Sequence, residues 1–389
     1  MRITKVESIP LRIANLDATA NDGSQETIVV KIHTDADIVG IGEVDASASM
    51  VKAVLEAPSC HNWSLSFEEM LLGENPLDVE RLWEKLYRGT IYTGRRGLVI
   101  HAISAVDLAL WDIAGKASAR PIYELLGGPR RRHVIPYASV HPWLSSLQET
   151  ERQVQHLMDR VVELGYRAVK LQLVYGDIYT DADLISLVRK ARKILGDEMT
   201  FMIDVGYRWM DAKAAIRTLQ QLEDCNLYFV ETPLRMDDLA GHARLAEAVT
   251  TRVAGAELFA SRWEALDLMD RGKVDVIQPD IGRAGGLTEY LRIARLANDR
   301  ALLCTPHGWK SGLTVAAEVH LSAAAENVPF IEYMVPELWP SVIRRELVRP
   351  EFAPQDGVIE LPRTPGLGVE LNEEVVGRLA KGFRAAAAS

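Results

Sequence analysis

The chain of 389 residues has little cysteine: only Cys60, Cys225 and Cys304, which stand far apart. This spacing forms no metal-binding pair, and an odd number of thiols cannot all pair within one chain. The sequence therefore predicts neither a disulfide framework nor a cysteine-based metal centre. Such sparse cysteine is typical of a protein that works in a reducing compartment, and we expect a cytoplasmic location.

The sequence also lacks an excess of positive charge and long apolar runs. With 44 basic against 54 acidic residues, the formal net charge is −10, which provides no global attraction for nucleic acid or anionic lipid. No stretch reaches the roughly 18 consecutive apolar residues of a membrane span, and the opening "MRITKVESIPLRI" alternates instead of forming a signal-peptide core. We expect a soluble protein with no nucleic-acid or membrane partner.

Two familiar catalytic motifs are missing. No serine sits in a Gly-x-Ser-x-Gly elbow, and the glycines of "DIGRAGGLTE" (280–289) have neither the Rossmann nor the P-loop spacing. A serine nucleophile and a phosphate-cradling loop are therefore not indicated, and the glycine-rich stretch predicts a tight turn between a strand and a helix.

The first third of the chain predicts an α+β domain, which we place at residues 1–125. Residues 1–45 alternate apolar and polar side chains as in a small antiparallel sheet, interrupted by the polar loop "NLDATANDGSQ" (15–25). The pattern then becomes helical. We expect Asn75 to cap one helix with Pro76 in its first turn, and "GLVIHAISAVDLALWDIAGKA" to form an apolar helix that ends near Gly115.

The middle of the chain, residues 126–340, alternates short apolar runs with amphipathic helices, as in a closed parallel barrel. The eight strand candidates are "VIPYASV", "AVKLQLV", "MTFMID", "NLYFVE", "RVAGAE", "KVDVIQPD", "ALLCTPH" and "PFIEY". The final segment, residues 341–389, contains the stretch "FAPQDGVIELPRTPGLGVEL", which is rich in proline and glycine and too irregular for a ninth unit. We expect it to run back over the barrel or onto the first domain.

Three consecutive strand candidates end on an acid: Asp204, Glu231 and Glu257, which are 27 and 26 residues apart. One strand-helix unit has this length, so in a barrel the three carboxylates meet at the C-terminal face, where barrel active sites lie. Buried carboxylates that converge need a cation, and an all-oxygen ligand set suits Mg²⁺ better than zinc. Any one acid alone could be a helix N-cap, but three in register with the repeat favour a metal site.

The next two strand candidates end on Asp280 and His307. An aspartate that accepts a hydrogen bond from one imidazole nitrogen fixes the tautomer and raises the basicity of the other nitrogen. A lone histidine is more often a core residue, but its place in this ordered series predicts a general base.

Other polar side chains fall at the same end of the predicted barrel. Lys170 and Gln172 share one face of the second strand, where the lysine is a base of lowered pKa, a fixed charge for a substrate carboxylate, or an ordinary surface residue. Glu332, on the eighth strand, is a candidate acid or hydrogen-bond partner. Tyr207 and Trp309 lie close to strand ends and are candidate substrate contacts.

With these residues in place, the chain resembles the mandelate racemase subgroup of the enolase superfamily over nearly its whole length. The stretches that carry the likeness are "HAISAVDLALWDIAGKASARPIYELLGG", "AVKLQL", "FVETPL", "VIQPDIGRAGGLTE", "TPHGWKSGL" and "PGLGVEL". The resemblance implies a modified (β/α)₇β barrel of the TIM type with an α+β capping domain formed by the N-terminal region and the C-terminal segment. It also implies Mg²⁺ on the three acids, and abstraction of the proton alpha to a carboxylate beneath a closing 15–25 loop. We expect a homo-oligomer, as is common in the subgroup.

One position departs from the racemases that the chain resembles, where a Lys-x-Lys pattern supplies a second base. Here the second lysine is replaced by Gln172, which cannot take a proton. A single histidine can remove the alpha proton and then protonate a departing beta hydroxyl, so the sequence favours dehydration of a sugar acid to a 2-keto-3-deoxy acid. In "GRRGLVIHAISAVDLALWD" the chain is similar to rhamnonate dehydratases.

Three alternatives remain open. A racemase or epimerase would need a second base, for which Lys170 is the obvious candidate on that strand. Cycloisomerisation is less favoured, because such relatives usually lack the histidine-aspartate pair. A ligand-binding protein without catalysis would not require the complete set of ligands and bases.

Overall fold

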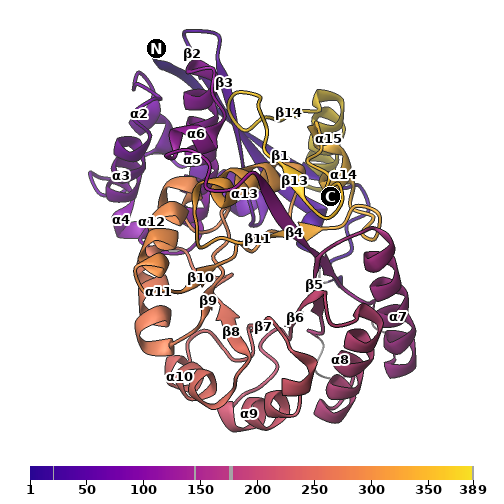
Figure 1. Ribbon diagram of the computed structural model, residues 1–389. Coiled ribbons are helices and arrows are strands. Elements are labelled where there is room, and N and C mark those ends of the chain that lie inside the picture. The colour runs from indigo at the N-terminus through magenta and orange to yellow at the C-terminus, as the bar shows by residue number, and fades with distance from the viewer. Residues whose placement is uncertain (21, 144–145, 175–177, 388–389) are drawn as a thin grey trace.

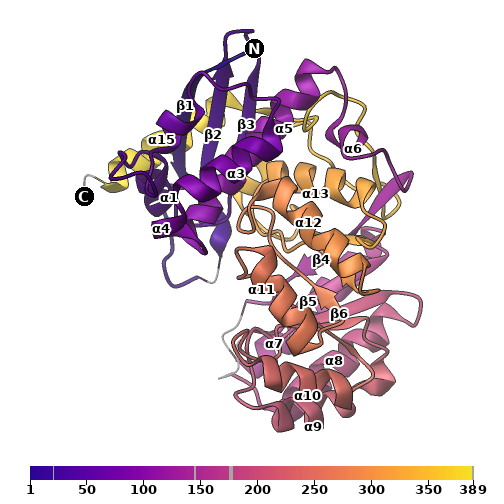
Figure 2. The ribbon, with the colours of Figure 1, turned by 90° about the vertical axis from the view of Figure 1, so that its left-hand side faces the viewer.

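The computed structural model describes residues 1–20, 22–143, 146–174 and 178–387. In Figure 1 the N-terminal region, in indigo and purple, lies over one side of a ring of strands and helices formed by the middle of the chain. Figure 2 shows the same two layers from the side, with the cap above and the barrel below. The expected α/β fold, a TIM-type barrel with an α+β cap, is confirmed.

The cap is built on an antiparallel sheet of β1 (Ile3–Arg12), β2 (Glu26–Thr34) and β3 (Val39–Val44). Alternate side chains of β2 enter different cores: Ile28 and Val30 pack in the cap, whereas Val29 joins the large core that continues into the barrel. This is the period-two pattern of a strand buried on both faces. The sheet therefore couples the cap to the barrel through its own side chains.

Six helices accompany this sheet: α1 (Ala48–Leu55), α2 (Phe67–Leu71), α3 (Val79–Gly89), α4 (Ile91–Gly94), α5 (Leu98–Ala117) and α6 (Ile122–Leu125). The expectation for α3 was wrong by one turn, because its N-cap is Asp78 and not Asn75. The Asn75 side chain accepts from the Leu77 backbone N–H and donates to the Asp78 carboxylate. It thus shapes the turn that leads into the helix, a use of asparagine that competes with N-capping.

Helix α5 is long and apolar enough to cross a membrane by length and composition alone, and 78% of its most apolar window is buried inside the protein. It carries Asp107 and Asp112, and Asp112 forms an ion pair with Lys116 at 2.8 Å. Acidic groups on a helix packed this way are typical of a core helix that connects two layers.

The barrel has eight parallel strands in the order β10-β9-β8-β7-β6-β5-β4-β11, and β13 (Ile359–Glu360) pairs with β4 in antiparallel fashion. Their bounds are β4 (His133–Val140), β5 (Ala168–Gln172), β6 (Thr200–Asp204), β7 (Phe229–Glu231), β8 (Arg252–Gly255), β9 (Val276–Ile277), β10 (Leu303–Cys304) and β11 (Phe330–Met334). Each of the eight expected runs contains one strand. The helices between them are α7 (Leu147–Glu163), α8 (Asp181–Leu195), α9 (Ala212–Gln220), α10 (Leu239–Ala248), α11 (Arg262–Asp267), α12 (Gly286–Asn298) and α13 (Gly312–Ala324).

Several strands are shorter than the runs that predict them. Glu257 lies two residues beyond β8, and both Asp280 and His307 lie three residues beyond their strands. Pro279 and Pro306 precede the last two residues, and proline cannot donate a hydrogen bond to the ladder. Asp280 and His307 nevertheless form an isolated parallel bridge, so the two loops stay side by side.

The C-terminal residues return to the cap. After α14 (Val342–Glu346), β12 (Val348–Arg349) pairs with β14 (Glu370–Leu371), and α15 (Glu373–Ala387) then packs along β1. Figure 1 shows this last helix, in yellow, beside the indigo sheet. An ion pair at 2.7 Å between Lys31 on β2 and Glu373 anchors its start.

Candidate active site

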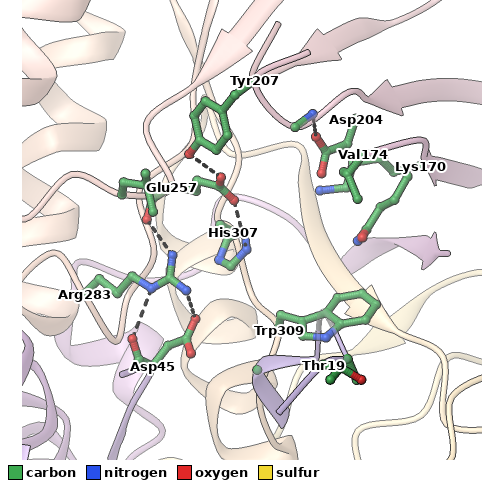
Figure 3. A pocket seen from close by; sticks show the side chains of 15 residues that line it. Thr19, Asp45, Lys170, Val174, Asp204, Tyr207, Glu257, Arg283, His307 and Trp309 are labelled. Atoms are coloured by element: carbon green, nitrogen blue, oxygen red, sulfur yellow. Dashed lines mark hydrogen bonds and ion pairs between the residues drawn. The ribbon is translucent and has the colours of Figure 1, made fainter. Parts of the chain in front are cut away.

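A pocket of about 580 Å³ lies where the C-terminal ends of the barrel strands meet the cap. Figure 3 shows barrel side chains and cap side chains pointing into the same space. The residues that line it are Thr19, Ala20, Gly23, Asp45, Lys170, Gln172, Val174, Asp204, Gly206, Tyr207, Glu257, Leu258, Arg283, His307 and Trp309. The carboxyl end of a barrel is the expected place for catalysis.

The three candidate metal ligands come from neighbouring strands. Asp204 and Glu231 end β6 and β7 and are paired directly across the parallel ladder, while Glu257 follows β8. Glu231 is fully buried and Asp204 is 8% exposed. The structure thus places the three acids at the same end of neighbouring strands, as the spacing predicts.

The electrostatics of these acids indicate a place for a cation. Burial, together with the neighbouring carboxylates, raises the pKa of both Asp204 and Glu231. The Glu231 Oε2 atom accepts from Lys170 and Gln278, but its buried Oε1 atom has no hydrogen-bond partner in the described part of the chain. Crowded carboxylates with an unused buried oxygen fit the all-oxygen ligand set of Mg²⁺.

The backbone close to the candidate ligands is in an unusual conformation. Thr232, directly after Glu231, has φ 49°, Ala256, directly before Glu257, has φ 109°, and Tyr207 has φ 61°. A positive φ is disfavoured for residues with a side chain, above all for a β-branched one. Such strain gathers at functional sites, where the surrounding fold holds it in place.

Asp280 and His307 form a hydrogen-bonded pair. The His307 Nδ1 atom lies 2.7 Å from Asp280 Oδ2, and the other Asp280 oxygen accepts from the Gly282 backbone N–H at 2.6 Å. Burial lowers the pKa of His307, but the bond to Asp280 and the charge of Glu332 outweigh this effect and raise the pKa to about 9. The Nε2 atom is directed toward Glu257, with Oε2 at 3.4 Å. A divalent cation on the acids would repel a protonated imidazole and lower this pKa.

Lys170 is buried between two carboxylates, so its interpretation as a surface lysine is wrong. Its Nζ atom lies 2.7 Å from Glu231 and 2.8 Å from Glu332. Although burial opposes the charge, the two acids raise the lysine pKa, which contradicts a base of lowered pKa. Lys170 is therefore a fixed positive charge in the site.

Glu332 lies in the middle of β11, not at its end as expected. Burial opposes its ionisation, but the Lys170 ammonium and the nearby His307 lower its pKa. Its oxygens also accept from the Ser139 hydroxyl at 2.6 Å and from the Gly308 backbone N–H at 3.0 Å. It thus ties the Lys170 side of the site to the loop that carries His307.

Gln172 donates its amide to the Ser139 hydroxyl at 2.9 Å. Ser139 in turn donates to Glu332, so the glutamine continues a chain of hydrogen bonds across the pocket wall. Sequence reasoning missed Ser139, although its position on the first barrel strand, one residue before the strand's end, was available as a signal.

The two candidate substrate contacts have structural partners as well. Tyr207 donates its hydroxyl to Glu257 Oε1 at 2.6 Å, which orients a candidate ligand. Trp309 donates its indole N–H to Asp22 at 3.3 Å, which connects the barrel to the 15–25 loop. Thr19, Ala20 and Gly23 of this loop line the pocket, whereas residue 21 lies outside the described residues.

Sequence reasoning also missed a charged cluster of Asp45, Arg283 and Lys310. The Asp45 carboxylate, just beyond the last cap strand, lies 2.5 Å from Arg283 and 2.9 Å from Lys310. Figure 3 shows the Arg283 guanidinium held between Asp45 and the Glu257 backbone. The sequence signal for this cluster was Asp45 itself. It directly follows a cap strand, just as the candidate metal ligands stand at the ends of barrel strands.

One further group, Asp45 with Asp280 and His307, has ligand atoms within 4.8 Å of one another. Its atoms already have partners, because the histidine Nδ1 is bonded to Asp280 and Asp45 is paired with Arg283 and Lys310. The crowded acids Asp204, Glu231 and Glu257 are the better candidate metal centre.

Two family models match the chain. Residues 3–127 match the mandelate racemase / muconate lactonizing enzyme N-terminal domain, and residues 153–375 match the enolase C-terminal domain-like family. Members of this superfamily typically bind Mg²⁺.

Individual relatives agree with these models. The chain is 32% identical to the L-rhamnonate dehydratase of Saccharopolyspora erythraea, over 90% of this chain and 84% of that protein. It is 29% identical to the D-galactarolactone cycloisomerase of Agrobacterium fabrum, over 90% of each chain. The crystal structure of a racemase from Streptomyces coelicolor with bound magnesium has a TM-score of 0.82 at 27% identity and covers 97% of this chain and 99% of that one. The chain belongs to the mandelate racemase and muconate lactonizing enzyme family of the enolase superfamily.

Proposed function

We propose that the protein is a Mg²⁺-dependent lyase that dehydrates a sugar acid to a 2-keto-3-deoxy acid. The observation that carries this proposal is the asymmetry of the pocket: a histidine-aspartate pair lies beside three convergent acids, and the opposite wall carries a glutamine. Relatives named as sugar-acid dehydratases support the same reaction.

Asp204, Glu231 and Glu257 would hold the metal. When bound, Mg²⁺ supplies positive charge that stabilises the negative charge developing on the substrate carboxylate as the weakly acidic alpha proton leaves. The protein contributes a second fixed charge at this place through Lys170, which Glu231 and Glu332 orient. The lysine and Gln172 are suited to bind the substrate carboxylate or a hydroxyl group.

His307 performs the proton transfers. Because Nδ1 is engaged by Asp280, Nε2 is the nitrogen that accepts the alpha proton from the substrate, once Glu257 binds the metal in place of this nitrogen. The same nitrogen then returns that proton to the beta hydroxyl, which leaves as water. The resulting enol becomes the 2-keto-3-deoxy acid, so one histidine suffices if both groups leave from its side.

The opposite wall is suited to binding and not to a second base. Gln172 has no proton-accepting nitrogen, and the Lys170 ammonium is held by two carboxylates. Among the described pocket residues, the structure offers no neutral amine that faces His307. This arrangement favours dehydration over racemisation or epimerisation.

The remaining expectations are part of this proposal. We place residues 1–125 in the capping domain, residues 126–340 in the catalytic barrel, and residues 341–389 in the segment that returns to both. We also expect a cytoplasmic homo-oligomer that acts on a small carboxylate and binds neither nucleic acid nor membrane.

The test is an assay of the Mg²⁺-loaded protein against pentonates, hexonates, deoxyhexonates and aldarates, with detection of 2-keto-3-deoxy product. We expect turnover that disappears in His307→Asn and is greatly reduced in Lys170→Ala. Deuterium uptake at the alpha position from heavy water without any dehydration would instead identify a racemase or epimerase.

A further inference from the structure

Glu257 is the candidate metal ligand that its own strand holds least. Asp204 and Glu231 are the last residues of β6 and β7, and the parallel ladder pairs them directly. Glu257 instead lies two residues beyond β8, outside the ladder, and its side chain is 18% exposed. The position of its carboxylate therefore depends on contacts with neighbouring loops.

Two side chains approach the two oxygens of the Glu257 carboxylate. The Tyr207 hydroxyl donates to Oε1 at 2.6 Å, whereas the His307 Nε2 atom lies 3.4 Å from Oε2. The first distance is short for an O–H···O hydrogen bond, and the second exceeds the usual N–H···O range of about 2.7–3.2 Å. Figure 3 shows Glu257 between these two side chains. The tyrosine hydroxyl is thus the closer restraint on the carboxylate.

Tyr207 is itself held next to the other two candidate ligands. Its backbone N–H donates at 2.7 Å to the oxygen of Thr232, the residue directly after Glu231. The preceding residue, Gly206, donates its N–H to Asp204 Oδ1 at 2.9 Å. The φ of Tyr207 is 61°, which is uncommon for a residue with a side chain. The loop that carries this tyrosine is therefore tied to both strand-end acids, and the hydroxyl reaches the third acid.

Repulsion among the three acids makes such a restraint necessary. Burial raises the pKa of both Asp204 and Glu231, and the charge of Glu257 raises each pKa further. This repulsion favours movement of the Glu257 carboxylate away from the other two acids, and the His307 imidazole offers it an alternative partner. A hydroxyl donor on a tied loop opposes that movement. Removing the hydrogen-bond partner of a metal ligand typically weakens metal binding by about 10- to 100-fold.

We infer that Tyr207 is a positioning residue for the candidate metal centre: its hydroxyl keeps the Glu257 carboxylate beside the other two acids and off the Nε2 atom of His307. This role rests on the proposed function, because it takes the acids to bind Mg²⁺ and the histidine to act as the base. It differs from the substrate contact that the sequence predicts for Tyr207, because the hydroxyl is engaged by Glu257.

The first test is the Mg²⁺ affinity of Tyr207→Phe, which removes the hydroxyl and keeps the ring that packs against the large core. Calorimetric titration of the full-length protein with Mg²⁺ alone measures the dissociation constant without any sugar acid. We expect this constant to rise by about 10- to 100-fold. Tyr228→Phe is the matched control, because Tyr228 directly precedes β7 and packs against Phe330 at the opposite end of the barrel. This control should keep the dissociation constant of the parent.

Kinetics then separate a positioning role from a substrate contact. At saturating Mg²⁺, Tyr207→Phe should keep the KM of the parent for the sugar acid and recover kcat to within about 3-fold, since the lost interaction acts through the metal. A raised KM with an unchanged Mg²⁺ dissociation constant would overturn the inference. Weakened Mg²⁺ binding in the variant of a protein that dehydrates no sugar acid would support the inference and overturn the proposed reaction.

A double-mutant cycle tests the competition for Glu257. In the His307→Asn background the imidazole no longer attracts this carboxylate, so Tyr207→Phe should weaken Mg²⁺ binding by a smaller factor than in the parent. The cycle uses the same titration and needs no substrate turnover. Equal factors in the two backgrounds would show that the hydroxyl does not hold Glu257 off the histidine, which contradicts the inferred role.

Discussion

His307 is the residue on which the proposed chemistry depends most directly. Replacing it with asparagine keeps a polar side chain near Asp280 but removes the nitrogen that would accept the alpha proton. We expect kcat to fall on the order of 10³-fold, as for the loss of a general base. Product formation and deuterium exchange at the alpha carbon should disappear together. An exchange rate close to that of the unmodified protein would assign the base to another residue.

If the three acids bind Mg²⁺, the metal should stabilise the folded protein. Mg²⁺ at about 100 times its dissociation constant should raise the free energy of unfolding by about 2.7 kcal/mol and increase Tm accordingly. Asp204→Asn should abolish this Mg²⁺-dependent shift. Without metal, however, the variant should be at least as stable as the parent, because burial and the neighbouring carboxylates disfavour an ionised Asp204.

Thermal unfolding with and without Mg²⁺ checks both parts of this prediction, and Ca²⁺ provides a comparison that tests for general divalent binding. A variant that still gains the full Mg²⁺-dependent Tm would remove Asp204 from the metal centre. A metal-free variant much less stable than the parent would show that Asp204 has a structural role in the barrel.

Single residues were predictable from the sequence where a repeat placed them. Asp204, Glu231, Glu257, Asp280 and His307 follow the length of one strand-helix unit, and the structure brings them together. Their partners were not predictable in this way. Asp45 and Arg283 are separated by 238 positions, and only the packing of the cap on the barrel makes them neighbours.

At the scale of elements, β3 and α5 approach each other very closely in the cap. A Cβ atom on Gly42 would lie 1.9 Å from the Ala105 backbone oxygen, and one on Gly40 would lie 2.0 Å from the Ala109 oxygen. The missing side chains let the helix backbone rest directly on the strand. Here glycine is required by close approach and not by an unusual φ.

Gly42→Ala should therefore reduce the free energy of unfolding by about 3 kcal/mol, at the upper end of the usual cost of overpacking, because helix backbone cannot move aside. Gly377→Ala is the matched control: it lies in the exposed face of α15, where an added Cβ meets nothing within 4 Å. That control should gain roughly 0.5 to 1 kcal/mol from helix propensity. Chemical denaturation measures both, and equal effects would contradict the close-packing argument.

Element positions could be predicted better than element ends. The eight apolar runs contain the barrel strands, but prolines and positive φ angles end several of them early. Helix α3 begins one turn late because Asn75 forms hydrogen bonds within the preceding turn. In both cases local backbone chemistry, which periodicity does not report, sets the boundary.

For the whole molecule, the contact between cap and barrel contains a titratable group. Asp107 on α5 accepts from the Thr288 backbone N–H at the start of α12, at 3.0 Å, and its other oxygen is buried without a partner in the described part of the chain. Burial raises the pKa of Asp107 to about 7, although the hydrogen bonds from Thr288 lower it in part. The interface thus favours a neutral carboxyl group.

The pKa of Asp107 is higher in the folded state than in the unfolded state. Its stabilising contribution to the free energy of unfolding is therefore fully present below about pH 4 and is lost as the pH rises through about 7. Between pH 5 and pH 8 the free energy of unfolding should fall by on the order of 2 kcal/mol from this group. Asp107→Asn should remove that part of the slope. Urea denaturation across this pH range measures it, and parallel curves for the two proteins would contradict the assignment.

The placement of α15 on β1 has a consequence for the order in which the two layers become stable. The cap strands lie within residues 3–44, yet the helix that packs along β1 begins at residue 373, and the whole barrel lies between them in the sequence. The barrel strands can therefore pair before α15 docks on the cap. A protein truncated before residue 373 should show a protease-resistant barrel beneath a protease-sensitive cap.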